Sequence, residues 1–241
     1  MDEISRWTGG IQGYYLFLGV FAAVAVWEGL YPVRKANATT ALRWLNNLLW
    51  LGINTLIIRL TLPFAAVSWA AQVNMMGWGV FNFFSAPSWL VLMLGLCLLD
   101  LGGYFLHVAF HRYRLLWRIH AIHHSDIDFD CTTGFRFHPF EVAISILWRL
   151  AIITVFGISP ASVAVYELWA ALQNLYGHAN TSFPEKVERI LKWLVVTPDM
   201  HRVHHASKTD QYDSNFGIIF PWWDRLFRHH KQFPTDQQAI M

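Results

Sequence analysis

The sequence predicts an all-α protein, a polytopic helical bundle with about four to five membrane helices and a helical cap in the cytosol. Three observations support this fold class. Of the 241 residues, 55% are hydrophobic and 14% are charged, whereas soluble domains carry about 25% charged residues. No Lys, Arg, Asp or Glu occurs between Leu60 and Leu99. Ten of the twelve histidines lie between His107 and His205, outside that uncharged stretch.

Five segments approach the length of about 20 apolar residues that a bilayer-spanning helix needs. They cover approximately residues 13–31, 45–69, 87–106, 140–158 and 161–176. Pro32 ends the first segment, and the turn signal Ser159-Pro160 separates the last two. These last two are short, so their length leaves open whether they cross the bilayer or form a hairpin that enters it partway.

The distribution of basic residues predicts the orientation in the membrane. Arg34, Lys35 and Arg43 make the first connection basic, whereas residues 62–88 carry no charge. Because cytoplasmic loops are enriched in Lys and Arg, the basic connection is expected in the cytoplasm. Every histidine cluster then lies on the cytoplasmic side of a multi-pass protein. We expect one integral-membrane domain over residues 1–241, with a cap formed by residues 107–141 and 178–241.

Charge and cysteine content exclude several classes of protein. The formal net charge is +2, which argues against a nucleic-acid partner and leaves the lipid bilayer as the expected surroundings. The two cysteines, Cys97 and Cys131, are too far apart in the sequence for a CxxC metal motif and form no disulfide framework.

Eight of the histidines form three short motifs in which side chains three or four residues apart share a helical face. The motifs are HVAFH (His107, His111), HAIHH (His120, His123, His124) and HRVHH (His201, His204, His205). Neutral imidazole is a ligand for iron, zinc and copper. Eight imidazoles exceed what one ion can hold, so the spacing predicts a site for two metals. His178 is a ninth candidate ligand.

The surrounding residues favour iron. Structural zinc sites commonly use cysteine, and zinc proteases use HExxH, which is absent because Ser125 follows His124. The Glu-x-x-His motif of carboxylate-bridged di-iron bundles is also missing. Two iron ions held mainly by imidazole, with open positions for oxygen, fit best. A zinc-dependent membrane hydrolase and a metal transporter are the alternatives, although a transporter should hold its ligands near the bilayer midplane.

Other residues are candidates for supporting roles, and no catalytic residue is expected beyond the metal ligands. Asn174 precedes His178 by one helical turn, and Asp100 precedes His107 by seven residues, so each is a candidate metal ligand or partner of a ligand. His138 is a candidate for metal binding or for a role beside the substrate. The candidates for substrate or membrane-interface contact are Trp222, Trp223 and Arg225.

The order and spacing of these motifs resemble the fatty acid hydroxylase and sterol desaturase superfamily, the membrane-bound histidine-rich di-iron oxygenases. The resemblance covers approximately residues 100–227. It includes the segments TGFRFHPFE, GHAN, SNFG and WDRLF, which begin at Thr133, Gly177, Ser214 and Trp223. It implies that all nine histidines are metal ligands. Some relatives have histidine at the position of Asn174, so the resemblance does not assign a tenth ligand.

The resemblance also implies a reaction and partners. Such enzymes use two iron ions, oxygen as co-substrate and external electrons to hydroxylate or desaturate a fatty acyl lipid, a sterol or a related lipid. Zinc can replace the iron in purified protein. Because the chain has no haem-attachment, flavin or clustered-cysteine motif, a separate electron donor is expected. A ferredoxin, or a cytochrome b5-like protein with its reductase, would fill that role.

Overall fold

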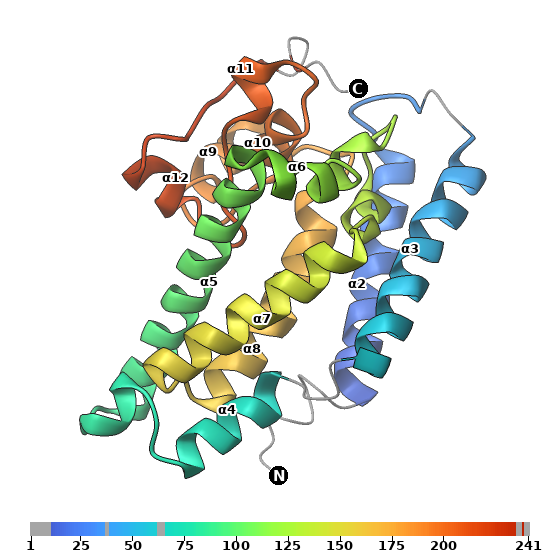
Figure 1. The fold of residues 1–241 in the computed structure, drawn as a ribbon. Coiled ribbons are helices and arrows are strands. Elements are labelled where there is room, and N and C mark those ends of the chain that lie inside the picture. The colour runs from blue at the N-terminus through green and yellow to red at the C-terminus, as the bar shows by residue number, and fades with distance from the viewer. Residues whose placement is uncertain (1–10, 37–38, 62–65, 235–237, 239–241) are drawn as a thin grey trace.

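The computed structural model describes residues 11–36, 39–61, 66–234 and 238, and none of these residues forms a β-strand. Long helices make up a bundle, and short helices gather at one of its ends (Figure 1). The long helices are α2 (Ile11–Leu30), α3 (Thr40–Thr61), α5 (Ser88–Arg112), α7 (Pro139–Phe156) and α8 (Pro160–Gly177). The all-α prediction is therefore confirmed for the described residues.

The short elements differ in where they lie along the bundle. The helix α4 (Ala66–Met75) lies at the end opposite the cluster of short helices (Figure 1), and η1 (Val80–Phe83) follows it. At the other end lie α6 (Arg114–His120), α9 (Glu185–Leu191), α10 (Pro198–His204), α11 (Thr209–Tyr212) and α12 (Trp222–Leu226). Two 3-10 turns, η2 (His123–Ser125) and η3 (Cys131–Phe135), connect α6 to α7.

Local sequence signals explain the turn between α7 and α8. Gly157 ends α7 in the left-handed conformation, with φ of 67°, which glycine adopts without steric cost. The Ser159 hydroxyl then accepts a hydrogen bond from the Ser162 backbone N–H, and Pro160 occupies the first turn of α8. The predicted turn at Ser159-Pro160 is therefore present.

Among the described residues, three helices are long and apolar enough to cross a membrane, which is consistent with a membrane protein: residues 12–30, 88–112 and 139–156. They correspond to the first, third and fourth predicted spans. The second predicted span, 45–69, is wrong in its extent, because α3 ends at Thr61 and Trp69 belongs to the separate helix α4. Residues 62–65, which fall inside that predicted span, lie outside the described residues. The fifth predicted span corresponds to α8, which has 18 residues and is not among the three.

The apolar core lies where α4, α5, α7 and α8 pack together. Leu99, Ile153 and Val163 are buried there, together with Ile219 from the segment that precedes α12. The outward faces of α2 and α3 are apolar instead of polar, as Tyr15, Leu18 and other large hydrophobic side chains are exposed. Contiguous exposed apolar surface of this kind is what a bilayer covers.

The connection between α2 and α3 lies at the end of the bundle that carries the histidines. The Val33 backbone N–H donates to the Asn180 carbonyl oxygen at 3.0 Å, and Asn180 follows His178 by two residues. The Asn180 side chain adds a hydrogen bond to the Arg34 carbonyl oxygen at 2.8 Å. The basic connection and the histidine motifs therefore share one end of the molecule.

Candidate metal centre

The end of the bundle with the short helices brings the histidine motifs together from four parts of the chain. His107 and His111 occupy the last turns of α5. The second motif runs from the end of α6 into η2, and the third occupies α10 and the residue that caps it. His178 caps the C-terminus of α8. Eight of these nine side chains are buried, and His111 is half-buried.

The nine imidazoles divide into two groups, and within each group the ligand atoms lie within 4.8 Å of one another. We name them the five-histidine group (His107, His111, His120, His124, His204) and the four-histidine group (His123, His178, His201, His205). Each HxxHH motif supplies both groups. Each group alone has enough imidazoles to hold one metal ion.

Helical geometry explains how one motif supplies both groups. Successive residues are about 100° apart around an α-helix, so i+3 and i+4 lie on opposite sides of residue i, about 60° and 40° from it, and about 100° from each other. His201 and His205 accordingly share the four-histidine group, whereas His204 between them belongs to the other group. The motif that begins at His120 is also divided, with His123 in the four-histidine group, but there the chain leaves α6 at His120 and the other two histidines lie in the 3-10 turn η2.

The Nε2 atoms of the four-histidine group converge. His178 Nε2 lies 3.0 Å from His201 Nε2, 3.1 Å from His205 Nε2 and 3.2 Å from His123 Nε2. Metal–imidazole bonds of about 2.0–2.1 Å place tetrahedral ligands roughly 3.3 Å apart, close to these separations. Without a cation, the unprotonated nitrogens would face each other lone pair to lone pair. The spacing and the donor set therefore fit a bound metal ion.

Hydrogen bonds determine which ring nitrogen is free to bind metal. The Nδ1–H of His107 donates to the Phe216 carbonyl oxygen at 2.9 Å, and that of His204 donates to the Ser214 carbonyl oxygen at 2.7 Å. A carbonyl oxygen only accepts, so Nδ1 carries the proton and Nε2 keeps its lone pair. The buried Nε2 atoms of His107 and His204 have no hydrogen-bond partner among the described residues.

Two other ligands are oriented by other parts of the fold. The His120 Nδ1 lies 2.7 Å from a carboxylate oxygen of Glu141 at the start of α7. The Nδ1–H of His178 donates to the Asn174 carbonyl oxygen, one turn earlier on α8, at 2.7 Å. Partners of this kind fix the ring orientation and raise the basicity of a metal-binding imidazole.

The segment that orients His107 and His204 is itself held in place. Asn215 has a φ of 53°, and its side-chain amide donates to the carbonyl oxygens of Met200 and Lys231. The buried carboxylate of Asp224 accepts the backbone N–H groups of Phe216 at 2.7 Å and Gly217 at 2.8 Å. The positions of two imidazoles thus depend on a carboxylate that touches neither.

Burial keeps the imidazoles outside the candidate membrane spans in their neutral form. Desolvation lowers the pKa of His178 to about 4. Desolvation, together with the neighbouring imidazoles, also lowers the pKa of His120, His123, His124, His201, His204 and His205 well below the ordinary value. Neutral imidazole is the form that ligates metals.

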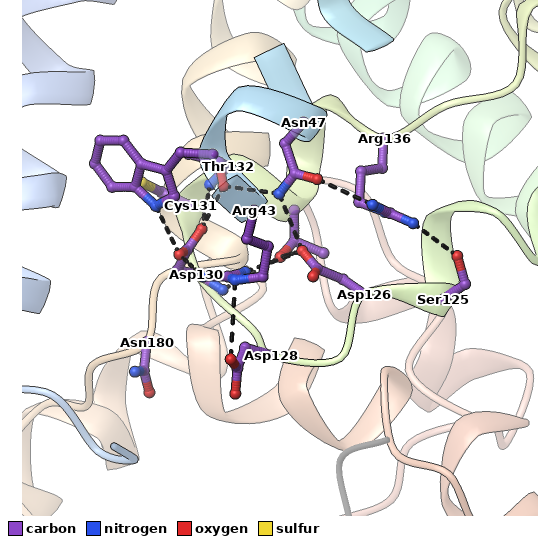
Figure 2. A network of polar contacts seen from close by, with 12 residues as sticks. Arg43, Asn47, Ser125, Asp126, Asp128, Asp130, Cys131, Thr132, Arg136 and Asn180 are labelled. Carbon is purple, nitrogen blue, oxygen red and sulfur yellow. Dashed lines mark hydrogen bonds and ion pairs between the residues drawn. The ribbon is translucent and has the colours of Figure 1, made fainter. Parts of the chain in front are cut away.

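An ion-pair network holds the segment that follows the second motif (Figure 2). Arg43 of α3 forms ion pairs with Asp126 at 3.0 Å, with Asp128 at 3.9 Å and with Asp130. Asn47, one turn further along α3, donates to Asp126 at 3.0 Å. Between these aspartates, the ring of Phe129 packs against His178, His201 and His205. The network therefore supports one wall of the four-histidine group.

The predicted supporting residues lie outside both groups. Asp100 is buried and accepts hydrogen bonds from the backbone N–H groups of Ile219 and Phe220 and from the Trp223 indole, so it holds a loop and not an imidazole. His138 caps α7, since its Nδ1 accepts the Phe140 backbone N–H at 3.1 Å. The Asn174 side-chain amide donates to the Gly134 carbonyl oxygen at 2.7 Å.

The three candidates for substrate or interface contact connect parts of the chain to each other. The Trp222 indole donates to the Trp193 carbonyl oxygen at 2.7 Å, and the Arg225 guanidinium lies over the Trp193 ring at 4.2 Å from its centroid. Trp223 donates to Asp100, as noted above. Trp222 is 41% exposed. None of the three lines the cavity that reaches the histidines.

That cavity has a volume of about 480 Å³ and lies between α5, α7 and α8. At one end it is lined by members of both histidine groups: His107, His120, His123, His178 and His201. Further along, its walls are mainly apolar. Its lining also contains Arg149 and Glu167, which were not among the residues predicted from the sequence, although a charge within a predicted span marks a candidate functional residue.

The fold and the site together define a class of protein, an all-helical chain with apolar spans whose two histidine groups could each bind a metal ion. The family model for fatty acid hydroxylases matches residues 92–229, which is more than half of the chain. The chain belongs to the fatty acid hydroxylase family. The resemblance drawn from the histidine motifs is thereby confirmed.

Several curated relatives match the same part of the chain. Alkylglycerol monooxygenase from Xenopus tropicalis is 31% identical over 144 residues, which cover 58% of this chain and 30% of the relative. Human alkylglycerol monooxygenase is 26% identical over 62% of this chain and 33% of its own length. Very-long-chain aldehyde decarbonylase CER1 from Arabidopsis thaliana is 31% identical over 52% of this chain and 20% of its own length. The chain thus spans a third or less of these relatives, and no solved structure matches it significantly.

Proposed function

We propose that this protein is a membrane-bound di-iron oxygenase that hydroxylates or desaturates an unactivated C–H position of a lipid. It would use oxygen and electrons from a separate donor protein. The nine histidines of the two groups would be the metal ligands, in a single membrane domain whose α3 and α8 add to the three apolar spans.

The observation that carries this proposal is that both histidine groups reach one largely apolar cavity. Its volume of about 480 Å³ falls within the range of roughly 300–1,000 Å³ for small-molecule sites. Leu106, Phe110 and Phe137 line it close to the imidazoles. An apolar chain entering this cavity would therefore bring a C–H bond towards both groups at once.

The donor set supports iron. Nine neutral imidazoles without a cysteine or bridging carboxylate differ from structural zinc sites and from carboxylate-bridged di-iron sites. When bound, iron would supply the redox chemistry with oxygen that oxidises a C–H bond. The protein orients the imidazoles through the carbonyl oxygens of Ser214 and Phe216 and through Glu141. Its apolar walls hold the lipid and exclude bulk water.

The hydrogen bonds between the first connection and Asn180 support the proposed orientation. They place Arg34 and Lys35 at the same end of the bundle as the histidines. Because basic connections favour the cytoplasm, we propose that the metal centre and its electron donor meet on the cytoplasmic side.

Two neighbouring residues give a matched test of the metal sites. His204 and His205 are adjacent and buried but belong to different groups. Metal content would be measured by elemental mass spectrometry on protein purified in mild detergent and reconstituted anaerobically with iron. We expect two irons per chain in the wild type. We expect His204→Ala and His205→Ala each to lose one, and the double variant to lose both.

Other outcomes of this test have defined meanings. If either single variant lost no iron, the assignment of that group would be wrong. If reconstituted wild type bound no iron, the di-iron proposal would fail. If the purified protein contained zinc, iron would be reconstituted in its place. Lipid turnover with oxygen and a reductase would then decide whether the protein is an oxygenase.

The cavity can be tested without changing a ligand. Ala171 lines the cavity from α8, and Ala171→Phe would fill part of it. We expect this variant to keep the wild-type iron content but to lose most lipid turnover. Unchanged turnover would show that the substrate approaches the metal centre by another route.

A further inference from the structure

One wall of the cavity, along α7, is polar. Glu141, Ser145 and Arg149 on α7 are spaced four residues apart, so they share one helical face, and all three line the cavity. Across the cavity, Arg149 Nη1 donates to Glu167 Oε1 of α8 at 3.0 Å. The Arg149 guanidinium also lies 5.8 Å from the centroid of the Tyr166 ring.

This ion pair is remote from the histidines. Glu141, which contacts His120, precedes Arg149 by eight residues, about 12 Å along α7 at 1.5 Å per residue. Glu167 precedes His178 by eleven residues, about 16 Å along α8 by the same rule. Leu99, Ile152 and Tyr166 line this remote part of the cavity. A molecule that filled the cavity would have one end at the imidazoles and the other at the ion pair.

The Arg149–Glu167 ion pair would be energetically expensive if its only role were to connect α7 to α8. Arg149 lies within a candidate membrane span, where an ionised side chain is expensive and usually faces a cavity or a functional partner. The pair is not sealed by packing, as the side chains are 29% and 33% exposed. Among the described residues, Glu167 is the one hydrogen-bond partner of the guanidinium, which has five N–H donors. Donors and carboxylate lone pairs therefore remain available to a ligand.

We propose that Arg149 and Glu167 form a binding subsite for an uncharged hydroxyl group at the far end of the lipid substrate. A hydroxyl can accept a hydrogen bond from the guanidinium and donate one to the carboxylate. A carboxylate or phosphate on the lipid would be repelled by Glu167, and an ammonium group by Arg149, at short range and low dielectric. The pair has no net charge, so it selects a neutral lipid.

This subsite, which rests on the proposed function, also predicts where oxidation occurs. With the hydroxyl bound by the ion pair, the carbon that reaches the imidazoles lies far along the molecule from that hydroxyl. The position oxidised is therefore remote from the polar end of the substrate and is set by the distance between the two ends of the cavity.

Binding of three probes with equal chain length tests the subsite. Radiolabelled dodecanol, dodecanoate and dodecane would be measured by equilibrium dialysis against iron-loaded protein in nanodiscs, without reductant, so that no turnover occurs. We expect wild-type protein to bind dodecanol at least about tenfold more tightly than either other probe, a difference of about 1.4 kcal/mol. Glu167→Gln leaves Arg149 as an unpaired cation, so we expect this variant to prefer dodecanoate.

Two further variants complete the design. Glu185→Gln removes the carboxylate of an exposed ion pair with Arg189, 2.8 Å long, and should leave all preferences unchanged. The variant Arg149→Met with Glu167→Met replaces the pair by apolar side chains, which match the mainly apolar walls of the cavity. It should lose the preference for dodecanol over dodecane, and it provides the test if Glu167→Gln does not fold.

The outcomes separate the two proposals. An unchanged order of affinities in both variants of the pair, or no preference for dodecanol in the wild type, would overturn the subsite. Iron binding and turnover could then still stand, because the metal test does not involve these residues. If protein taken through the same iron reconstitution bound no iron but showed the predicted preferences, the oxygenase proposal would fail and the subsite would remain.

Discussion

The two histidine groups differ in what holds them together. In the five-histidine group, His107 and His204 are oriented by neighbouring carbonyl oxygens of the 214–216 segment, and His120 is oriented by Glu141. In the four-histidine group, His178 donates to the Asn174 carbonyl oxygen, but the buried Nδ1 atoms of His123 and His201 have no hydrogen-bond partner among the described residues. The Nε2 atoms of this group lie 3.0–3.2 Å apart. The protein scaffold thus orients the first group, whereas the second depends more on a cation at its centre.

Removing the metal should expose this difference most strongly. Anaerobic chelation would leave converging Nε2 atoms without a cation, so we expect the apparent melting temperature to fall by more than about 10 °C, at roughly 2–4 °C per kcal/mol. Hydrogen exchange should increase more at residues 201–205 than at residues 214–216. Equal loss of protection in the two segments would contradict the proposed difference between the groups.

Arg43→Ala should have the next largest effect and should act on the four-histidine group. The change leaves Asp126 and Asp130 without their buried cation, a situation that typically costs about 3–5 kcal/mol. Because this network supports Phe129, we expect weaker metal binding in the four-histidine group. Thermal unfolding and metal titration would measure both effects.

An exposed ion pair provides the control for Arg43→Ala. Arg189 and Glu185 have side chains that are 65% and 87% exposed, and such pairs contribute about 0–1 kcal/mol. Arg189→Ala should therefore leave unfolding and metal binding nearly unchanged. Similar effects of the two substitutions would show that the buried network adds no particular stability.

Asp224→Asn should have a smaller effect, confined to the five-histidine group. The amide keeps one acceptor oxygen where the carboxylate accepts two backbone N–H groups, so the segment that holds His107 should loosen. Outer partners of metal ligands typically contribute 10–100-fold in affinity, and we expect about tenfold here. Competition with a chelator would measure it. A larger loss of affinity in the four-histidine group than in the five-histidine group would contradict the separation.

The sequence was most informative where chemistry depends on residue type alone. Three histidine motifs predicted a site for two metals, and the structure places the imidazoles in two groups. The assignment of each histidine to its group could not be predicted, because it depends on where α10 and η2 turn in space. The role of the Ser214 and Phe216 carbonyl oxygens in orienting the imidazoles could not be predicted either, because every residue has a backbone carbonyl oxygen.

Long-range packing explains the other differences. Asp100 lies seven residues before His107, so its sequence position predicts a contact with that imidazole. Its carboxylate instead accepts hydrogen bonds from the 219–223 segment, which packs against α5. The second predicted span joined what are two helices, because the apolar composition of residues 45–69 was weighted above Pro63, a break signal two residues after Thr61, where α3 ends. Arg149 and Glu167 lie on different helices, so their pairing required the fold.

The adjacency of His204 and His205 has a consequence for how the protein would be loaded with metal. Under the proposed function, consecutive residues bind different ions, so an ion captured by one group fixes the backbone that carries ligands of the other. The conformational entropy lost in the first binding event need not be lost again in the second. Metal uptake should therefore be positively cooperative, and chains that carry a single ion should be rare at intermediate metal concentrations.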